Sequence, residues 1–146
     1  MSPTSLAVRR GSCLCKKVQF EIHGQPWTYV VCHCVNCQKF SGSAFMANAF
    51  FLFKDVMITE GKDHIKTYED SITKSGQPLI RSFCGECGSS LFLRSVTTNL
   101  IIVNTGSIDD KLETDANIKV PKCEIFVENK RPWLLVQAND GRKARL

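Results

Sequence analysis

The chain has 146 residues, of which 43% are apolar and 23% are charged, and its formal net charge is +5. These proportions are typical of a globular domain and exclude a disordered or fibrous protein, and no apolar run approaches the ~20 residues of a membrane-spanning helix. The length suits one domain with its own core. Because the first ten residues lack the apolar stretch of a signal peptide, we expect a cytoplasmic protein.

Strands dominate the predicted secondary structure. Apolar and polar side chains alternate in residues 18–22, as in a half-buried strand. Further segments rich in aromatic and β-branched residues predict strands at 29–33, 44–53, 65–68, 79–83, 90–93, 100–103 and 123–127. Only residues 35–40 predict a short helix, which the loop 41–43 ends. The chain is therefore predicted to be one mostly β domain with short helical turns.

The eight cysteines are grouped rather than scattered. Cytosolic reductants keep thiols free, so this density of cysteine in a cytoplasmic protein indicates metal ligands rather than disulfides. The groups are the pair Cys13 and Cys15, the trio Cys32, Cys34 and Cys37, the pair Cys84 and Cys87, and the single Cys123.

The two pairs predict one complete metal site. On an extended strand, Cys13 and Cys15 project from the same face, so both sulfurs can turn toward one ion. A C-x-x-C turn such as Cys84 to Cys87 also directs two thiolates at one centre, and Gly88 relaxes the backbone of that turn. Together the pairs predict a tetrahedral structural zinc site that joins the N-terminal strand to a later hairpin.

The trio predicts a different kind of site. Cys32, Cys34 and Cys37 offer three ligands from one short segment and leave one tetrahedral position open, which is typical of catalytic zinc. We therefore expect two zinc ions per chain, one structural and one catalytic. Other interpretations are a redox C-x-x-C pair, which the lack of a βαβ unit disfavours, inert buried cysteines, which the clustering disfavours, and an iron–sulfur centre.

The order of these motifs resembles the glutathione-dependent formaldehyde-activating enzyme (Gfa) family, which includes the related centromere-protein-V domain. The resemblance covers about residues 8–134 and includes Ser41-Gly42 after the trio, Arg81 before the second pair, and the final Arg131-Pro132-Trp133. It implies an all-β, tent-like zinc-binding fold of small antiparallel sheets, with the same division into a structural and a catalytic zinc. Residues 1–7 are then expected to be a disordered N-terminus, and residues 135–146 a basic C-terminal tail.

The resemblance also implies an activity, that of a carbon–sulfur lyase which reversibly joins glutathione to formaldehyde. A thiol that enters the open position of the trio would lose its proton and attack an aldehyde carbonyl, and cleavage is the same path reversed. The expected substrate is a thiol–aldehyde adduct, with glutathione as one candidate thiol, or a related small carbonyl compound. Alternatives are an addition or cyclisation reaction on the same fold, and a noncatalytic binding module for protein or nucleic acid with two structural zincs.

Two departures from the family pattern affect the expected substrate contacts. The family commonly has glycine after the first C-x-C and arginine after the trio, where this chain has Lys16 and Gln38. Lys39 has two interpretations: it is a solvated surface lysine, or it replaces the lost cation and is a candidate contact for a substrate carboxylate. Ser41 and Phe45, in and just after the loop that follows the trio, are the other candidate substrate contacts.

Cys123 stands where the family often has histidine, and three interpretations of it are open. It could close the trio as a fourth ligand, contact the substrate, or be an ordinary strand cysteine. His33 lies between two trio cysteines, so on an extended backbone its ring is expected to point away from the metal. Phe50, Phe53 and Trp133 are interpreted as core residues.

Overall fold

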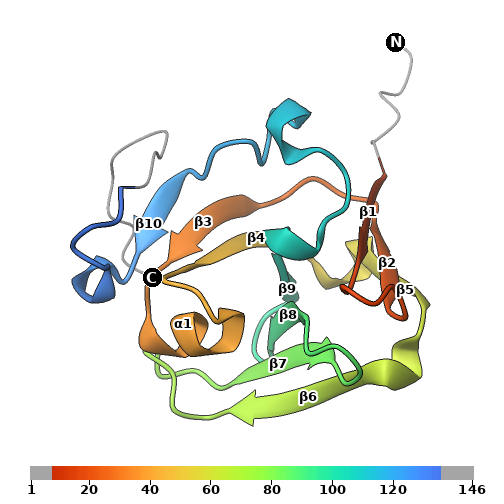
Figure 1. The fold of residues 1–146 in the computed structure, drawn as a ribbon, viewed down its shortest axis with the longest axis horizontal. Coiled ribbons are helices and arrows are strands. Elements are labelled where there is room, and N and C mark those ends of the chain that lie inside the picture. Colours follow the sequence, from red (N-terminus) through yellow and green to blue (C-terminus); the bar gives the residue numbers. More distant parts are fainter. Residues whose placement is uncertain (1–7, 136–146) are drawn as a thin grey trace.

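The computed structural model describes residues 8–135, and within them the chain forms ten strands and one α-helix. The prediction of a mostly β fold with a short helix is confirmed. The strands make a three-stranded sheet in the order β1-β2-β5 and a seven-stranded sheet in the order β10-β3-β4-β9-β8-β7-β6. Figure 1 shows the small sheet at one side of the molecule, with α1 and β10 at the opposite side.

The small sheet contains β1 (Arg9–Ser12), β2 (Gln19–Ile22) and β5 (Val56–Glu60). The large sheet contains β3 (Thr28–Cys32), β4 (Met46–Leu52), β6 (Ile65–Asp70), β7 (Leu79–Cys84), β8 (Ser90–Ser95), β9 (Leu100–Asn104) and β10 (Cys123–Ile125). The helix α1 is Val35–Ser41. Single 3-10 turns follow at Phe53–Asp55, Lys62–His64, Thr105–Ser107, Leu112–Thr114 and Val127–Asn129.

The large sheet is mixed rather than purely antiparallel. In the spatial order β3-β4-β9-β8-β7-β6, neighbouring strands pair antiparallel, whereas β10 pairs parallel to β3 at one edge. A parallel neighbour of β3 needs a long connection, and the chain reaches β10 only after the other nine strands. The consequence for function is that β10 brings residues near the C-terminus beside the strand that carries Cys32.

The strands β1 and β5 were not predicted. For β1, the reason is the composition of its buried positions. Its buried positions include Arg9, which donates hydrogen bonds to Asp115 and to the carbonyl of Gly24, instead of an apolar residue. Gly11 is also buried, and a Cβ there would lie 2.1 Å from Cζ of Phe20. A strand whose inward positions are arginine and glycine shows no hydrophobic alternation.

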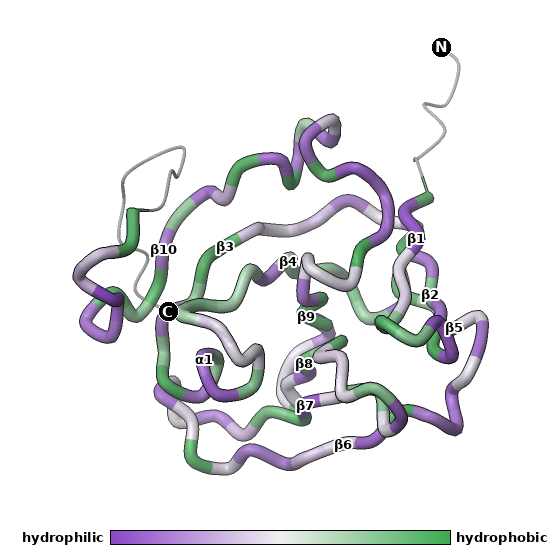
Figure 2. The backbone as a smooth tube through the Cα atoms, in the orientation of Figure 1, coloured by the Kyte–Doolittle hydropathy of each residue, from purple (hydrophilic) through white to green (hydrophobic). Residues whose placement is uncertain are grey.

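The large sheet separates two hydrophobic clusters, because successive side chains of a strand point to opposite faces. In β4, Ala49 and Phe51 belong to the first cluster, whereas Met46 and Phe50 belong to the second. Figure 2 shows hydrophobic β9 at the centre of the molecule, beside β4. The second cluster also contains the cysteine trio, so the trio lies on the face of β3 and β4 that carries Met46 and Phe50.

The C-terminal part differs from one expectation. Trp133, which was interpreted as a core residue, is 72% exposed, so that interpretation is wrong. The expected disordered segment 1–7 lies outside the described residues, as does the expected basic tail apart from Leu135, which is exposed. Among residues 8–135, no helix combines the length and the apolarity that a membrane crossing would need.

Candidate metal centres and active site

The first cysteine group joins the two sheets. Cys13 and Cys15 lie in the turn between β1 and β2, Cys84 ends β7, and Cys87 lies in the turn before β8. All four sulfurs lie within 4.8 Å of one another. The C-x-C pair projects from a turn and not from the extended strand that we expected, yet both of its sulfurs face the same point. The structure thus brings both predicted pairs together.

The spacing of these sulfurs fits a tetrahedral metal. With zinc–sulfur bonds of about 2.3 Å, two ligands of a tetrahedron lie about 3.8 Å apart. The sulfur of Cys15 lies 3.5 Å from that of Cys13 and 3.8 Å from that of Cys84. The backbone N–H of Val18 donates to the sulfur of Cys13 at 3.2 Å, which favours the thiolate form. A four-thiolate set of this size fits zinc.

The turn from Cys84 to Cys87 is built for two ligands. The N–H of Gly88 donates to the carbonyl of Cys84 at 2.8 Å, and Gly88 has φ = 75°, a left-handed conformation that favours glycine. The hydroxyl of Ser89 lies 3.2 Å from the sulfur of Cys87 and accepts from the N–H of Leu14 at 2.9 Å. Hydrogen bonds from Ser89 lower the pKa of Cys87 to about 5, so this sulfur is ready to ligate as a thiolate.

Lys16 occupies the position where the resemblance led us to expect glycine, and its backbone takes the conformation that glycine prefers, with φ = 65°. Its N–H donates to the carbonyl of Cys13 at 3.0 Å and closes the turn. Its ammonium group donates to the hydroxyl of Ser12 at 2.8 Å and pairs with Asp109 at 3.3 Å. The turn expected of the family therefore forms without glycine.

The trio forms the second group. Cys32 ends β3, Cys34 is the N-cap of α1, and Cys37 lies in the first turn of that helix. Their sulfurs lie within 4.8 Å of one another and all three residues are buried. The N–H of Cys37 donates to the sulfur of Cys34 at 3.3 Å, so the cap of the helix fixes the geometry of two ligands.

The three thiols of the trio lie so close together that they can all be thiolates only when a cation is bound among them. Hydrogen bonds donated by Cys32 and then by Cys37 lower the pKa of Cys34 to about 2. Conversely, the pKa of Cys32 is raised far above its ordinary value, because its thiol donates to Cys34 and Cys37 and is buried. One thiolate is stable here, but three would repel one another without a positive ion. The set therefore suits a divalent metal that accepts soft ligands.

A buried ion pair supports the trio from the side of β7. The guanidinium group of Arg81 donates to Asp70 at 2.7 Å, and its Nη1 lies 3.9 Å from the sulfur of Cys37. Burial lowers the pKa of Arg81, but the hydrogen bond to Asp70 and the charge of Cys37 outweigh this effect, so the pKa is raised overall. The amide of Asn36 donates to both carboxylate oxygens of Asp70, at 3.1 and 2.9 Å. Arg81 is thus a fixed positive charge beside one ligand sulfur.

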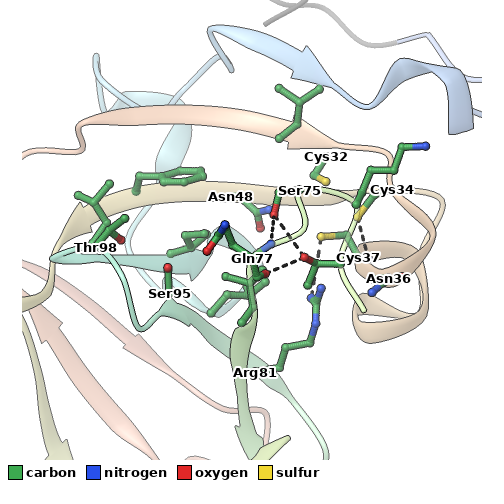
Figure 3. Close-up of a pocket in the computed structure, with 18 of the residues that line it drawn as sticks. Cys32, Cys34, Asn36, Cys37, Asn48, Ser75, Gln77, Arg81, Ser95 and Thr98 are labelled. Atoms are coloured by element: carbon green, nitrogen blue, oxygen red, sulfur yellow. Dashed lines mark hydrogen bonds between the residues drawn. The ribbon is translucent and has the colours of Figure 1, made fainter. Parts of the chain in front are cut away.

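The trio opens into a cavity of about 280 Å³. Figure 3 shows the three sulfurs at one end of this cavity, with Ser95 and Thr98 at the other end. Its wall is largely apolar and is formed by Trp27, Phe50, Leu79, Leu93, Leu100, Ile102, Ile125 and Phe126. An apolar cavity with a few polar groups at a metal site is the usual form of a small-molecule site.

The predicted substrate contacts lie elsewhere in the structure. Lys39 is exposed on the outer side of α1, and Ser41 donates its hydroxyl to the carbonyls of Cys37 at 2.8 Å and Phe45 at 3.1 Å. The ring of Phe45 lies 6.3 Å from that of His33. None of these three candidates lines the cavity of the trio, whereas Phe50, interpreted as a core residue, does. Their contact with a substrate stays a prediction.

Cys123 lies in β10 and belongs to the same hydrophobic cluster as the trio. The group of sulfurs within 4.8 Å of one another nevertheless contains only Cys32, Cys34 and Cys37 among the described residues. Cys123 is also absent from the residues that line the cavity. In this geometry the trio has three protein sulfurs and leaves room for a ligand from the cavity.

A further layer of polar contacts anchors the trio segment to the C-terminal segment. His33 is fully buried, and its Nε2 lies 2.7 Å from a carboxylate oxygen of Glu124, which also pairs with Lys130 at 2.8 Å. The amide of Gln38 donates to the carbonyls of His33 at 2.7 Å and Asn129 at 3.1 Å. The ring of His33 thus bonds Glu124, away from the metal position, and Gln38 joins the two segments at the position where the resemblance led us to expect arginine.

Three residues around the trio were not among the sequence candidates. Arg81, Asp70 and Asn48 are all buried, and Arg81 and Asn48 line the cavity. For Arg81 and Asn48, the signal that could have identified them is a polar side chain at an inward position of a predicted strand, whereas Asp70 lies beyond the predicted strand 65–68. A buried charge or amide is costly unless it has a partner, so such a position indicates a specific role.

Two comparisons with known proteins point to one family, and a third concerns the fold. A family model described as glutathione-dependent formaldehyde-activating enzyme matches residues 8–129. A curated Halomonas elongata protein, whose name assigns it provisionally as a glutathione-dependent formaldehyde-activating enzyme, is 25% identical over 132 residues, which are 89% of this chain and 82% of that protein. A crystal structure of a Rhodobacter sphaeroides protein is similar with a TM-score of 0.56 at 17% identity, covering 70% of this chain and 89% of that one. The last similarity concerns the fold alone.

Proposed function

The chain belongs to the glutathione-dependent formaldehyde-activating enzyme family, and on this premise we propose that it is a zinc-dependent carbon–sulfur lyase. Its substrate would be an adduct of a thiol, such as glutathione, with an aldehyde, or a related small carbonyl compound. The observation that carries the proposal is the gathering of three buried sulfurs, those of Cys32, Cys34 and Cys37, at one end of an open cavity.

We assign two zinc ions to each chain. The pairs Cys13 with Cys15 and Cys84 with Cys87 would hold a structural zinc with no open position, and the trio would hold the catalytic one. When bound to the trio, zinc supplies a Lewis acid that stabilises a substrate sulfur as thiolate at neutral pH. The proposal includes a reducing, cytosolic compartment, because seven ligand thiols must stay reduced.

The reaction conserves atoms and needs no oxidant. In the adduct R–CH(OH)–S–R′, the carbon–sulfur bond breaks, the carbon–oxygen bond becomes the carbonyl of R–CHO, and the hydroxyl proton is lost as the thiol R′–SH gains one. Arg81, 3.9 Å from the sulfur of Cys37, stabilises negative charge at this end of the cavity. The apolar wall limits the access of water, which strengthens these electrostatic interactions.

The cavity favours a catalyst over a noncatalytic module with two structural zincs. A purely structural site would be expected to have four protein ligands and no adjacent space, as in the four-cysteine group. The trio instead adjoins a cavity of about 280 Å³ with an apolar wall and a buried cation. This arrangement can bind and orient a small molecule.

The experiment that tests the function combines metal content with an exchange assay. Purified protein is expected to contain two zinc ions per chain, and the zinc-loaded protein is expected to release formaldehyde from S-hydroxymethylglutathione or an aldehyde from another hemithioacetal. In cobalt-substituted protein, added thiol should strengthen the sulfur-to-cobalt charge-transfer band. One zinc or none, or a cobalt spectrum that thiols do not change, would contradict the proposal.

A further inference from the structure

Asn48 is the one lining residue of the cavity whose buried polar atom has no partner among the described residues. Its side chain is 3% exposed, and its Oδ1 makes no hydrogen bond. A buried acceptor without a partner destabilises the folded state, because it loses its hydrogen bonds to water and gains none in return. Such a group is retained more readily where a ligand satisfies it, and Asn48 lines the cavity of the trio.

The register of the sheet places Asn48 near the metal-binding end of the cavity. Asn48 lies directly opposite Val30 in the antiparallel pair of β3 and β4, so both side chains share the face that carries Cys32. Cys32 pairs with Met46, which makes Asn48 its diagonal neighbour, at a typical separation of about 7–8 Å. Figure 3 shows the amide of Asn48 between the sulfurs and the far end of the cavity.

The charges around the cavity disfavour the binding of glutathione, because glutathione carries carboxylates. Arg81 and Lys74 are the cations that line it, and each has a carboxylate partner: Asp70 for Arg81 at 2.7 Å and Glu128 for Lys74 at 3.2 Å. Three ligand thiolates also exceed the charge of one divalent ion, so the metal-binding end is negative overall. An added carboxylate would be repelled there and would lose its hydration against an apolar wall.

From these observations, and resting on the proposed lyase function, we infer the substrate class: an uncharged hemithioacetal with an apolar body, whose hydroxyl donates a hydrogen bond to Oδ1 of Asn48. The hydroxyl is the group that distinguishes the adduct from its parent thiol, so Asn48 is a specificity residue for the adduct. The wall formed by Trp27, Phe50 and Phe126 would contact the aldehyde or thiol substituent. Glutathione adducts would be poor substrates of this member of the family.

Binding of matched thiols tests this inference without turnover. The probes are 3-phenylpropane-1-thiol, its 2-hydroxy derivative, and glutathione, titrated into metal-loaded protein by calorimetry. The hydroxythiol is expected to bind about tenfold more tightly than the thiol without hydroxyl, because one net hydrogen bond is gained. Glutathione is expected to bind more weakly than both. Equal affinity of the first two thiols would mean that Asn48 binds only water, and tighter binding of glutathione would refute the apolar class; either result overturns the inference.

The variant Asn48→Leu separates a role in recognition from a role in folding. Leucine has a similar size and removes the unpartnered acceptor, so the midpoint of urea unfolding should stay the same or rise, while the preference for the hydroxythiol disappears. Thr98→Val, which removes a polar group at the far end of the same cavity, is the matched control and should keep the preference. If Asn48→Leu keeps the preference, the inference is wrong. If that variant does not fold, the comparison of the three probes on the unmodified protein decides.

Turnover distinguishes failure of the inference from failure of the proposed function. The hemithioacetal of phenylacetaldehyde with ethanethiol is compared with S-hydroxymethylglutathione, and kcat/KM is expected to be at least about tenfold higher for the apolar adduct. Cleavage of S-hydroxymethylglutathione with equal or higher efficiency would reject the substrate class and leave the lyase function intact. Cleavage of neither adduct would reject the lyase function, and the thiol titrations would then still test the apolar, hydroxyl-bearing ligand.

Discussion

Ile125, and not Cys123, is the direct cross-strand neighbour of Cys32. In the parallel pair of β10 and β3, Ile125 pairs with Cys32, whereas Cys123 pairs with Val30. Two residues along a strand correspond to about 6.6 Å, so the register places the backbone of Cys123 about that far along β10 from the position opposite Cys32. An apolar side chain therefore occupies the place beside the trio from which β10 could supply a fourth ligand.

The first prediction is that Cys123→Ser retains both metal ions. Because the register keeps Cys123 out of the trio, the variant should contain two zinc ions per chain, and its cobalt spectrum should match that of the unmodified protein. Elemental analysis and visible absorption are the measurements. Cys37→Ser is the matched control and is expected to bind one zinc, since it removes a sulfur of the trio itself. Loss of one zinc in Cys123→Ser would show that Cys123 is a ligand.

The second prediction uses the same register to close the open position. Ile125→Cys places a thiol directly opposite Cys32, at the inter-strand spacing of about 4.8 Å. This variant is expected to hold metal at the trio more tightly, and its cobalt spectrum should no longer respond to added thiol. Ile125→Ser, which removes the same apolar wall without adding a sulfur, is the control and should still respond. A full response to thiol in Ile125→Cys would contradict the register argument.

The third prediction contrasts the two metal groups. Cys84 belongs to the group that joins the small sheet to β7, and the free energy of binding a structural zinc amounts to about 10 kcal/mol or more, comparable to the whole stability of a domain. Cys84→Ser should therefore leave the domain largely unfolded. Cys34→Ser affects a group drawn from one short segment and should keep cooperative unfolding while losing lyase activity. Circular dichroism during urea unfolding checks both, and equal unfolding of the two variants would indicate two structural sites.

The features that the sequence predicts correctly depend on residues that lie close together in the chain. Two-residue and three-residue spacings bring the sulfurs of a pair together in almost any turn, so the grouping of Cys13 with Cys15 and of Cys84 with Cys87 follows from local geometry. The fold class follows equally from alternation within single strands. The strand β1 was missed because its inward residues, Arg9 and Gly11, are recognised as buried only when Asp115 and Phe20 are placed against them.

The wall of the cavity could not be predicted in this way, because it is non-local. Lys39 was chosen for its closeness to the trio in the sequence, but two residues along a helix correspond to a rotation of about 200°, so Lys39 faces away from Cys37. Asn48 approaches Cys32 only through the pairing of β3 with β4. Which residues such an inward polar side chain approaches depends on the register of the sheet, and the sequence alone does not provide that register.

The fourth prediction concerns the buried pair of Arg81 and Asp70. Arg81→Met leaves the carboxylate of Asp70 buried without its cation and should cost about 3–5 kcal/mol of unfolding free energy. The double variant Arg81→Met with Asp70→Leu should recover much of this loss, giving a coupling energy above about 1 kcal/mol. The exposed pair Lys74 and Glu128 is the control, and its coupling should be much smaller, because solvent screens exposed ion pairs. Additive effects of the Arg81 and Asp70 substitutions would contradict a direct interaction.

The fifth prediction is a pH dependence at Asp115. Burial raises the pKa of Asp115, but hydrogen bonds from Arg9 and from the N–H of Asn117 outweigh this effect. The pKa of Asp115 is therefore below its ordinary value of 3.8. A lowered pKa in the folded state means that the unfolded state binds the proton first, so this stabilisation is complete above about pH 5 and is lost as the pH falls through the lowered pKa. Asp115→Asn should therefore cost about 1.5 kcal/mol at pH 6 and progressively less below pH 4. Urea unfolding of both proteins measures the difference, which cancels their shared loss of metal ligation in acid, and exposed Asp63→Asn is the control. A difference that stays constant from pH 6 to pH 3 would show that the charge of Asp115 does not stabilise the fold.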